Sequence, residues 1–163
     1  MGQADDFTDL YRQYLPRILN YVRLRVGDEA VAQDLTAEVF ERAVAKQHTL
    51  RRREAFGAWL FRIARNTVAG YYRQRRPSIP LERATERPDE TASPLDSLIR
   101  REELAKMLDA LSNLSDREQE IIRLKFAAGL GNQEIGQVMR LRAGHVAVLQ
   151  YRALRKLRTL LDG

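Results

Sequence analysis

Four of the chain's five prolines fall within one stretch of 18 residues, and this cluster restricts the fold more than any other feature. The four are Pro77, Pro80, Pro88 and Pro94. Proline lacks a backbone donor and disfavours the helical conformation of the residue before it, so no continuous helix can pass through this stretch. We therefore expect two small domains, residues 1–76 and 95–163, joined by a linker at 77–94. The alternative is a long ordered loop within one domain.

Charge divides the chain in the same way. The 163 residues include 28 Lys and Arg against 22 Asp and Glu, which gives a formal charge of +6. Residues 1–76 carry a net charge of +5, residues 77–98 a net −3 and residues 99–163 a net +4. Two basic segments about an acidic tether favour an acidic partner, of which nucleic acid is the commonest.

Composition favours an all-α protein without catalytic or metal chemistry. Glycine and proline are scarce, at 9 and 5 residues, while 31% of the residues are charged. Cysteine is absent and the two histidines, His48 and His145, are isolated, which excludes disulfides and makes a metal site improbable. The sequence contains no Ser–His–acid trio and no glycine-rich phosphate loop, so we expect neither an enzyme nor a cofactor. No apolar run approaches the roughly 20 residues that span a bilayer, and no signal peptide is evident. We expect a cytoplasmic protein without membrane insertion.

Three or four helices are predicted in the first segment. Apolar residues recur at helical spacing from Phe7 to Val22, where Pro16 should kink or interrupt the helix and Gly27 should end it. Asp28 should cap the next helix. The apolar stripe of that helix consists of Val31, Leu35, Val39 and Ala43. A further helix over 55–76 carries on its inner face Phe56, Leu60, Ile63, Thr67 and Tyr71.

The other face of the helix over 55–76 has the composition of a single-strand binding surface. It presents Trp59, Arg62, Asn66 and Arg73. Five arginines and no acidic residue lie between Arg62 and Arg76, interleaved with Tyr71 and Tyr72. Arginines neutralise phosphates, and aromatic rings stack on unpaired bases for about 1–3 kcal/mol each. This pattern suits an opened strand, although the aromatic residues could instead belong to the core and the arginines could simply be solvated.

The helix after Asp28 predicts a different kind of contact. Its non-core face shows three carboxylates, Asp34, Glu38 and Glu41, beside Thr36 and Phe40. An acidic face with a protruding aromatic residue repels DNA and suits a basic protein partner. The alternative is a solvated face without a partner.

The second segment predicts a helix-turn-helix. A helix should begin at Ser93-Pro94, and Ser115 with Glu118 should form a capping box for the next one. A short helix over 133–139, a tight turn and a basic helix over 143–160 follow. The last helix should bury Val146, Leu149, Ala153, Leu157 and Leu160. Its outer face carries His145, Gln150, Arg152, Arg155, Lys156 and Arg158, which suit base edges and phosphates. The alternative is a basic helix that only packs on its own domain.

Several short motifs in these segments resemble the bacterial extracytoplasmic-function sigma factors. Asp34-Leu-Thr-Ala-Glu-Val-Phe40 is similar to the Asp-Leu-Thr-Gln-Glu-Val-Phe segment of that family. Ala58-Trp-Leu-Phe-Arg-Ile-Ala-Arg-Asn-Thr67 resembles the family's promoter-opening helix. Gln133-Glu-Ile-Gly136, Gly144-His-Val146 and Tyr151-Arg-Ala-Leu154 resemble its helix-turn-helix. The motifs cover nearly the whole chain and follow the family's order.

The resemblance implies a sigma region 2 domain over 1–76 and a sigma region 4 domain over 95–163. It implies that core RNA polymerase is bound by Asp34, Leu35, Thr36, Glu38 and Phe40. It implies that the minus-ten strand is captured with the loop at about 46–54 and by Trp59, Arg62, Arg65, Asn66, Tyr71, Tyr72, Arg73, Arg75 and Arg76. It implies that the minus-thirty-five duplex is read by Arg142, His145, Gln150, Arg152, Arg155 and Lys156. Core RNA polymerase, promoter DNA and an anti-sigma factor are the implied partners.

The chain departs from the family pattern at several positions. Ala37 stands where glutamine is usual, and Gly70 stands where aspartate is common. Arg140 stands where glycine usually occupies the turn, and Arg142 where serine usually caps the recognition helix, at a cost of about 1 kcal/mol. His145 and Ala147 replace frequent threonine and lysine residues, so the minus-thirty-five sequence is not transferable from relatives.

Three functions follow from these patterns. The first is a non-enzymatic transcription initiation subunit that gives core polymerase promoter specificity. The second is a self-sufficient helix-turn-helix regulator that binds duplex DNA without polymerase. The third is a protein-interaction module without a DNA role. A helix rich in Trp, Arg and Tyr has no place in the second function, and the sequence shows no dimerisation heptad.

Overall fold

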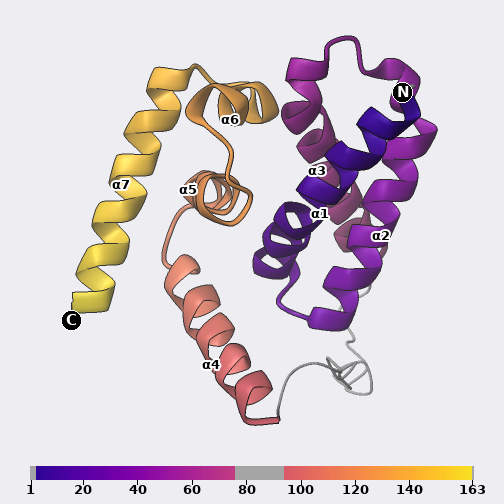
Figure 1. Cartoon of the computed structure of the whole chain (residues 1–163). Coiled ribbons are helices and arrows are strands. Elements are labelled where there is room, and N and C mark those ends of the chain that lie inside the picture. The colour runs from indigo at the N-terminus through magenta and orange to yellow at the C-terminus, as the bar shows by residue number, and fades with distance from the viewer. Residues whose placement is uncertain (1–2, 76–93, 163) are drawn as a thin grey trace.

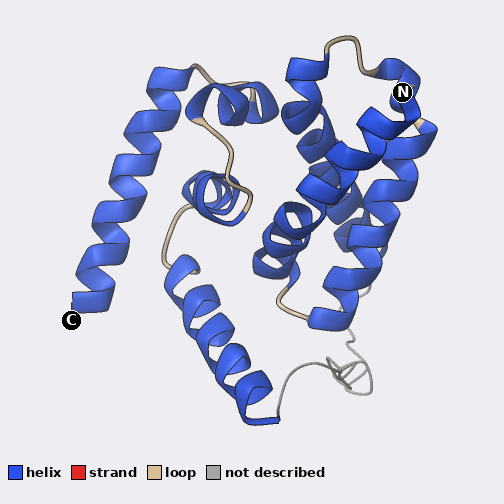
Figure 2. Cartoon of the chain, in the orientation of Figure 1, coloured by secondary structure: helices blue, strands red, loops and turns tan. Residues whose placement is uncertain are grey.

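In the computed structural model, residues 3–75 and 94–162 are described, and every regular element among them is helical (Figure 2). The predicted linker at 77–94 lies outside these residues except for Pro94. None of the described helices combines the length and the apolar character needed to cross a bilayer.

The N-terminal half consists of α1 (Gln3–Val26), α2 (Glu29–Ala45) and α3 (Phe56–Gln74), with two 3-10 turns, η1 (Gln47–Thr49) and η2 (Arg53–Ala55), between α2 and α3. Helix α2 is capped as predicted, because the Val31 N–H donates to Asp28 Oδ1 at 3.0 Å. Helix α1 runs through Pro16, so of the kink or interruption predicted there, the interruption does not occur. A proline inside a helix costs about 3 kcal/mol, and burial of Ile18, Tyr21 and Val22 within the next two turns offsets that cost.

The C-terminal half consists of α4 (Pro94–Leu111), α5 (Asp116–Ile122), a π-helical turn η4 (Arg123–Ala127), α6 (Asn132–Met139) and α7 (Ala143–Asp162). The predicted capping box is present: Glu118 N–H donates to Ser115 Oγ at 3.2 Å, and Ser115 N–H donates to Glu118 Oε1 at 2.9 Å. The chain leaves η4 through Gly129, whose φ of +73° is a conformation that glycine adopts without strain.

The two halves share the larger hydrophobic core, while a smaller cluster in the second half consists of Leu111, Leu114, Ile122 and Ala153. Buried residues of α1, α2 and α3 form a single cluster with Ile121, Leu124, Leu130, Ile135 and Val146 from the second half. Helix α6 packs on α3, and the η4 turn packs on α1 (Figure 1). We call the surface where the halves meet the seam.

One residue of α7 that was predicted to be buried is exposed. Val146, Leu149 and Ala153 are buried as expected, but Leu160 is 43% exposed. The last turns of α7 are only partly covered: Leu157 is half-buried, whereas Leu161 is 75% exposed.

Candidate nucleic-acid interface

The outer face of α3 and the loop before it form one continuous polar surface. Arg62, Asn66 and Arg73 are exposed on α3. Trp59 is half-buried, with its ring 5.6 Å from that of Phe56 and its Nε1–H donating to Thr49 Oγ1 at 2.9 Å. Thr49 belongs to η1, so this hydrogen bond joins the helix to the loop at residues 46–52. One edge of the indole is therefore fixed by the protein while part of the ring remains accessible.

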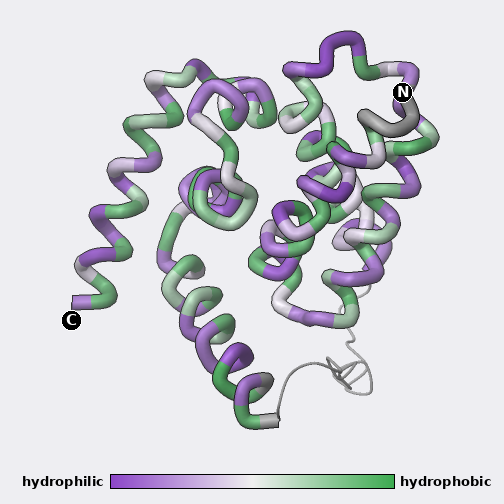
Figure 3. The backbone as a smooth tube through the Cα atoms, viewed as in Figure 1, coloured by the Kyte–Doolittle hydropathy of each residue, from purple (hydrophilic) through white to green (hydrophobic). Residues whose placement is uncertain are grey.

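The loop contributes three arginines that the sequence prediction included only as part of the segment at about 46–54. Arg51, Arg52 and Arg53 are all exposed. Most residues between α2 and α3 are hydrophilic (Figure 3). Gln47 Nε2 donates to the Tyr11 hydroxyl at 2.9 Å, which ties the start of the loop to α1. Three consecutive arginines beside a tryptophan are a sequence signal that could have added these residues to the candidate set.

The C-terminal end of α3 holds a small aromatic and cationic stack. The rings of Tyr71 and Tyr72 are 5.2 Å apart in an edge-to-face arrangement, and the Arg75 guanidinium lies 5.2 Å from the Tyr71 ring and donates to its hydroxyl. The Tyr72 hydroxyl donates to the backbone carbonyl of Arg25 at 2.8 Å, and burial raises the pKa of Tyr72. These groups are ordered before any ligand binds. Arg76, the last candidate of this set, lies outside the described residues.

Two candidate arginines of α3 are already engaged across the seam. Arg62 donates through Nε and Nη2 to the carbonyl of Gln137, at 3.2 and 2.7 Å. Arg65 donates through Nη1 to the carbonyl of Val138 at 3.2 Å and forms an ion pair through Nε with Glu120 Oε2 at 2.6 Å. Both carbonyls belong to the last turn of α6.

The accessible face of α2 is acidic, as predicted, but it includes fewer residues than the periodicity indicated. Asp34 and Glu41 are exposed, and Glu38 is half-exposed in an ion pair with Arg42 at 2.9 Å. Leu35 and Thr36 are 6% and 4% exposed, so Thr36 does not lie on the non-core face where the periodicity placed it. Both α1 and α3 pack on α2 and cover a wider strip of it than a single apolar stripe indicates.

Phe40 does not protrude from α2 as the sequence suggested. Its ring is half-buried and meets the Tyr11 ring edge to face at 5.6 Å, with an angle of 90°. The reason is again the neighbouring helix α1, which supplies Tyr11. A partner could contact the three carboxylates on this face. Leu35, Thr36 and Phe40 lie on the inner side of the helix, where they pack against the neighbouring helices.

The second candidate surface is the helix-turn-helix of α6 and α7. Arg140, between the two helices, has a φ of +59°, and its backbone N–H donates to the carbonyl of Gly136. A non-glycine residue in this left-handed conformation costs about 1–2 kcal/mol. The sequence comparison with the family pattern had placed Arg140 where glycine is usual, and the geometry explains that preference.

The outer residues of α7 differ in their availability. Arg142, His145, Arg152 and Arg155 are exposed, whereas Gln150 is half-buried. The Lys156 Nζ donates to Glu118 Oε1 at 2.8 Å, and Glu118 is nearly buried. This hydrogen bond holds the pKa of Glu118 below its usual value. Lys156 therefore has a structural partner within its own half of the chain.

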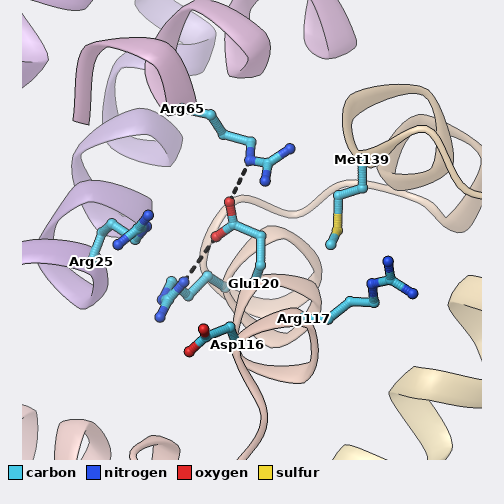
Figure 4. A pocket seen from close by; sticks show the side chains of 7 residues that line it. Arg25, Arg65, Asp116, Arg117, Glu120 and Met139 are labelled. Atoms are coloured by element: carbon cyan, nitrogen blue, oxygen red, sulfur yellow. Dashed lines mark hydrogen bonds and ion pairs between the residues drawn. The ribbon is translucent and has the colours of Figure 1, made fainter. Parts of the chain in front are cut away.

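A polar cavity of about 420 Å³ opens along the seam (Figure 4). It is lined by Arg25, Arg65, Asp116, Arg117, Glu120, Arg123 and Met139. At its centre Glu120 accepts hydrogen bonds from Arg123 Nη1 at 2.9 Å and from the buried Tyr21 hydroxyl at 2.8 Å, besides the ion pair with Arg65. Burial raises the pKa of Tyr21, and the adjacent carboxylate raises it further. Sequence reasoning did not single out Glu120, and only its place one turn before the apolar Leu124 hinted that it is buried.

Both halves of the chain match models of one protein family. The family model "Sigma-70 region 2" matches residues 10–77, and "Sigma-70, region 4" matches residues 110–159. The ECF RNA polymerase sigma factor BldN of Streptomyces coelicolor is 38% identical over 163 residues, which are 98% of this chain and 62% of BldN. The ECF RNA polymerase sigma factor ShbA of Streptomyces griseus subsp. griseus is 32% identical over 175 residues, with 99% of this chain and 90% of ShbA covered.

A solved structure has the same fold. The structure of CnrH in complex with the cytosolic domain of CnrY matches with a TM-score of 0.72 and 25% identity, over 99% of this chain and 90% of that chain. The region 2 and region 4 matches, in this order on one helical chain, define a transcription protein of the sigma class. The chain belongs to the ECF RNA polymerase sigma factors.

Proposed function

We propose that the chain is a promoter-specificity subunit: it binds core RNA polymerase, directs it to promoters and helps to melt the minus-ten region. It acts without catalytic chemistry of its own and works in the cytoplasm, where polymerase and DNA are found. The observation that carries this proposal is that region 2 and region 4 matches occur in order on one chain. The chain spans 62% of the length of BldN and 90% of the length of ShbA, so its similarity to ShbA extends over nearly all of that protein.

The carboxylates of α2 are the proposed polymerase contact. Asp34 and Glu38 project from a helix whose other side is fixed in the core, so their positions are set before a partner binds. A basic surface on core polymerase would be attracted to this acidic face, which steers association. Leu35, Thr36 and Phe40 act from beneath by fixing the helix and its orientation.

Helix α3 and the loop before it are the proposed minus-ten site. A base leaves the duplex at a cost of a few kcal/mol, and stacking on an aromatic side chain returns about 1–3 kcal/mol per base. Trp59 lies where helix meets loop, and Tyr71 and Tyr72 lie three turns further along α3. Asn66 and Arg73 are exposed on the same helix, Arg75 caps its C-terminal end, and Arg76 follows in the sequence. We assign them contacts with the strand backbone and with exposed base edges.

Helix α7 is the proposed minus-thirty-five reader. Arg142 and His145 precede or open the helix, where residues of a recognition helix reach base edges. Arg152 and Arg155 are exposed further along and suit phosphate contacts, which fix register. Gln150 and Lys156 are proposed as weaker contributors because the first is half-buried and the second pairs with Glu118.

A regulator that binds duplex DNA alone is not favoured. Such a protein needs only a helix-turn-helix, whereas this chain also matches region 2 over residues 10–77 and has an aromatic and basic α3. We further propose a protein partner of the anti-sigma class that sequesters the chain. The similar CnrH was solved with part of another protein, CnrY, bound to it.

Reconstituted transcription tests the proposal. The purified chain and core polymerase would be incubated with a pool of promoter fragments, and bound fragments would be selected and transcribed. We expect specific transcripts only when both proteins are present. A chain that fails to bind core polymerase, or that selects the same duplex sites with and without it, would refute the proposal.

A further inference from the structure

The cavity along the seam holds more positive than negative charge. Its lining includes two carboxylates, Asp116 and Glu120, and four arginines: Arg25, Arg65, Arg117 and Arg123. Four arginines less two carboxylates leave the lining with a formal charge of +2. Like charges in a partly buried site repel each other unless a counter-charge lies between them. The cavity is therefore suited to an additional anion.

Glu120 neutralises only part of this charge. Its side chain is nearly buried, and one of its oxygens pairs with Arg65 at 2.6 Å while the other pairs with Arg123 at 2.9 Å. Arg25 and Arg117, in contrast, form no ion pair within the described part of the chain. Two guanidinium groups of the lining therefore remain available to a ligand.

Two buried donors of the lining also lack an acceptor. The Nε atoms of Arg25 and Arg123 are buried and make no hydrogen bond with the described residues. The Arg123 side chain is only 10% exposed, although its Nη1 and Nη2 donate to Glu120 and Gln119. Buried donors in folded proteins are nearly always paired, because bulk water is not there to replace a missing acceptor. The lining therefore lacks acceptor oxygens as well as negative charge.

The fold holds these arginines in position. The Arg25 guanidinium lies 5.6 Å from the centre of the Tyr72 ring, and the Arg65 guanidinium donates to a backbone carbonyl of α6 at 3.2 Å. Figure 4 shows Arg25 and Arg117 on opposite sides of Glu120, and the two belong to α1 and α5. Donors that are already ordered lose less conformational entropy when a ligand binds.

Phosphate oxygens match such a lining. Guanidinium groups bind phosphates through paired hydrogen bonds to two oxygens. The cavity volume of about 420 Å³ lies in the range of about 300–1,000 Å³ that small-molecule sites occupy. This limited volume favours a compact molecule over a DNA strand, whose phosphates follow an extended backbone. Arginines on opposite sides of the cavity favour linked phosphate groups over a single one.

We propose that this cavity is a binding site for a small molecule with linked phosphate groups, whose oxygens accept hydrogen bonds from Arg25, Arg117 and Arg123. None of these three arginines belongs to either proposed DNA surface. The site goes beyond the proposed function and does not rest on it, because the binding requires neither polymerase nor promoter.

Titration calorimetry with pyrophosphate, at constant ionic strength, measures this binding directly. We expect one site per chain. Arg25→Gln and Arg117→Gln should each weaken binding by about tenfold or more, because each removes charged hydrogen bonds to the ligand. Arg158→Gln makes the same change in net charge at an exposed position of α7 outside the cavity. It should change the affinity by less than about twofold, since solvent and salt screen distant charges.

Asp116→Asn gives a change of the opposite sign, which misfolding cannot imitate. The substitution removes a carboxylate from the lining, so pyrophosphate should bind about two- to tenfold more tightly. Asp116 is exposed at the start of α5, and circular dichroism confirms that the variant is folded. Unchanged or weaker binding in the folded variant would overturn the proposal.

Nitrogen-15 NMR of the arginine side chains locates the ligand. Pyrophosphate should shift the Nε–H signal of Arg25 and leave that of Arg158 in place, each signal being identified by its loss in the corresponding glutamine variant. A labelled oligo(dT) strand tests the other source of phosphate, and Arg117→Gln should leave its affinity unchanged. The proposal is wrong if the chain does not bind pyrophosphate or if Arg117→Gln leaves pyrophosphate affinity unchanged. It is also wrong if Arg117→Gln weakens oligo(dT) binding as much as pyrophosphate binding, because the cavity would then be a DNA contact.

Discussion

The backbone N–H of Arg140 donates to the carbonyl of Gly136, and this hydrogen bond ends α6 with Arg140 at a φ of +59°. One residue later, the Leu141 N–H donates to the same carbonyl at 2.9 Å. The tight turn of the helix-turn-helix therefore needs a left-handed residue at one position and a very small residue at the other. The chain supplies the small residue but places an arginine at the left-handed position.

Replacing Arg140 by glycine should stabilise the protein. The substitution relieves about 1–2 kcal/mol of left-handed strain, against which glycine's greater freedom in the unfolded chain costs about 0.5–1 kcal/mol. We expect a net gain of about 0.5–1 kcal/mol in the free energy of unfolding, measured by urea denaturation. Gln137→Gly, at an exposed position inside α6 without a positive φ, is the control and should lose up to about 1 kcal/mol. Equal effects in the two variants would contradict this account of the turn.

Gly136→Ala should have the opposite effect. A Cβ at Gly136 would collide with the backbone carbonyl of Leu141, and backbone cannot move aside as a flexible side chain can. We expect a loss of about 1–3 kcal/mol, the usual cost of overpacking. At Gly144 in α7, a Cβ would meet nothing within 4 Å, so Gly144→Ala should be neutral or stabilising by up to about 1 kcal/mol. A tolerated Gly136→Ala would show that the turn is looser than described.

The Glu118–Lys156 contact should make part of the stability acid-sensitive. Since the folded-state pKa of Glu118 is lowered, its contribution is fully present well above its usual pKa of 4.5 and is lost as pH falls through the lower folded value. Lys156→Met should raise the folded-state pKa of Glu118 toward its usual value. The variant should be less stable at neutral pH by about 1 kcal/mol in the free energy of unfolding. Below about pH 5, its free energy of unfolding should fall less with pH than that of the parent chain. Urea denaturation across pH measures both effects. Arg155→Met, at an exposed neighbouring position, should follow the parent curve.

Local features of the fold followed from the sequence because neighbouring residues determine them. The Asp28 cap and the Ser115 capping box each depend on residues within one helical turn. The family motifs then indicated the order of the two regions. Residue types at these positions were enough, without knowledge of distant contacts.

The seam could not be predicted in the same way, because it depends on pairs far apart in the sequence. Tyr21 and Glu120 are 99 residues apart, and Arg62 and Gln137 are 75 apart. Periodicity assigned Arg62 to a solvated or DNA-facing surface, because no residue near Arg62 in the sequence indicates that its guanidinium donates to the carbonyl of Gln137. The burial of Thr36 was missed for a related reason: one helix's pattern does not reveal that two others cover it.

Asp34→Arg should weaken binding to core polymerase by about tenfold or more, because a like charge opposite a basic partner costs several kcal/mol. Binding would be measured by fluorescence anisotropy of the labelled chain with core polymerase at two salt concentrations. Glu103→Arg makes the same change in net charge on α4 and should alter binding much less. If both variants bind equally, the acidic face of α2 is not the polymerase contact.

Trp59→Ala should impair promoter opening while leaving core polymerase binding intact. The indole lies at the junction of α3 and the loop, held by Thr49, and its loss removes a stacking surface worth about 1–3 kcal/mol, or roughly 5- to 150-fold in the opening equilibrium. Opening would be followed by permanganate reactivity of unpaired thymines on a cognate promoter. Trp59→Phe keeps a stacking ring and should retain part of the activity. A promoter that is already unpaired over the minus-ten region requires no base to leave the duplex, so it should restore much of the transcription lost in Trp59→Ala. If the variant opens duplex promoters at the parent's level, or if the unpaired promoter brings no recovery, Trp59 does not act in strand opening.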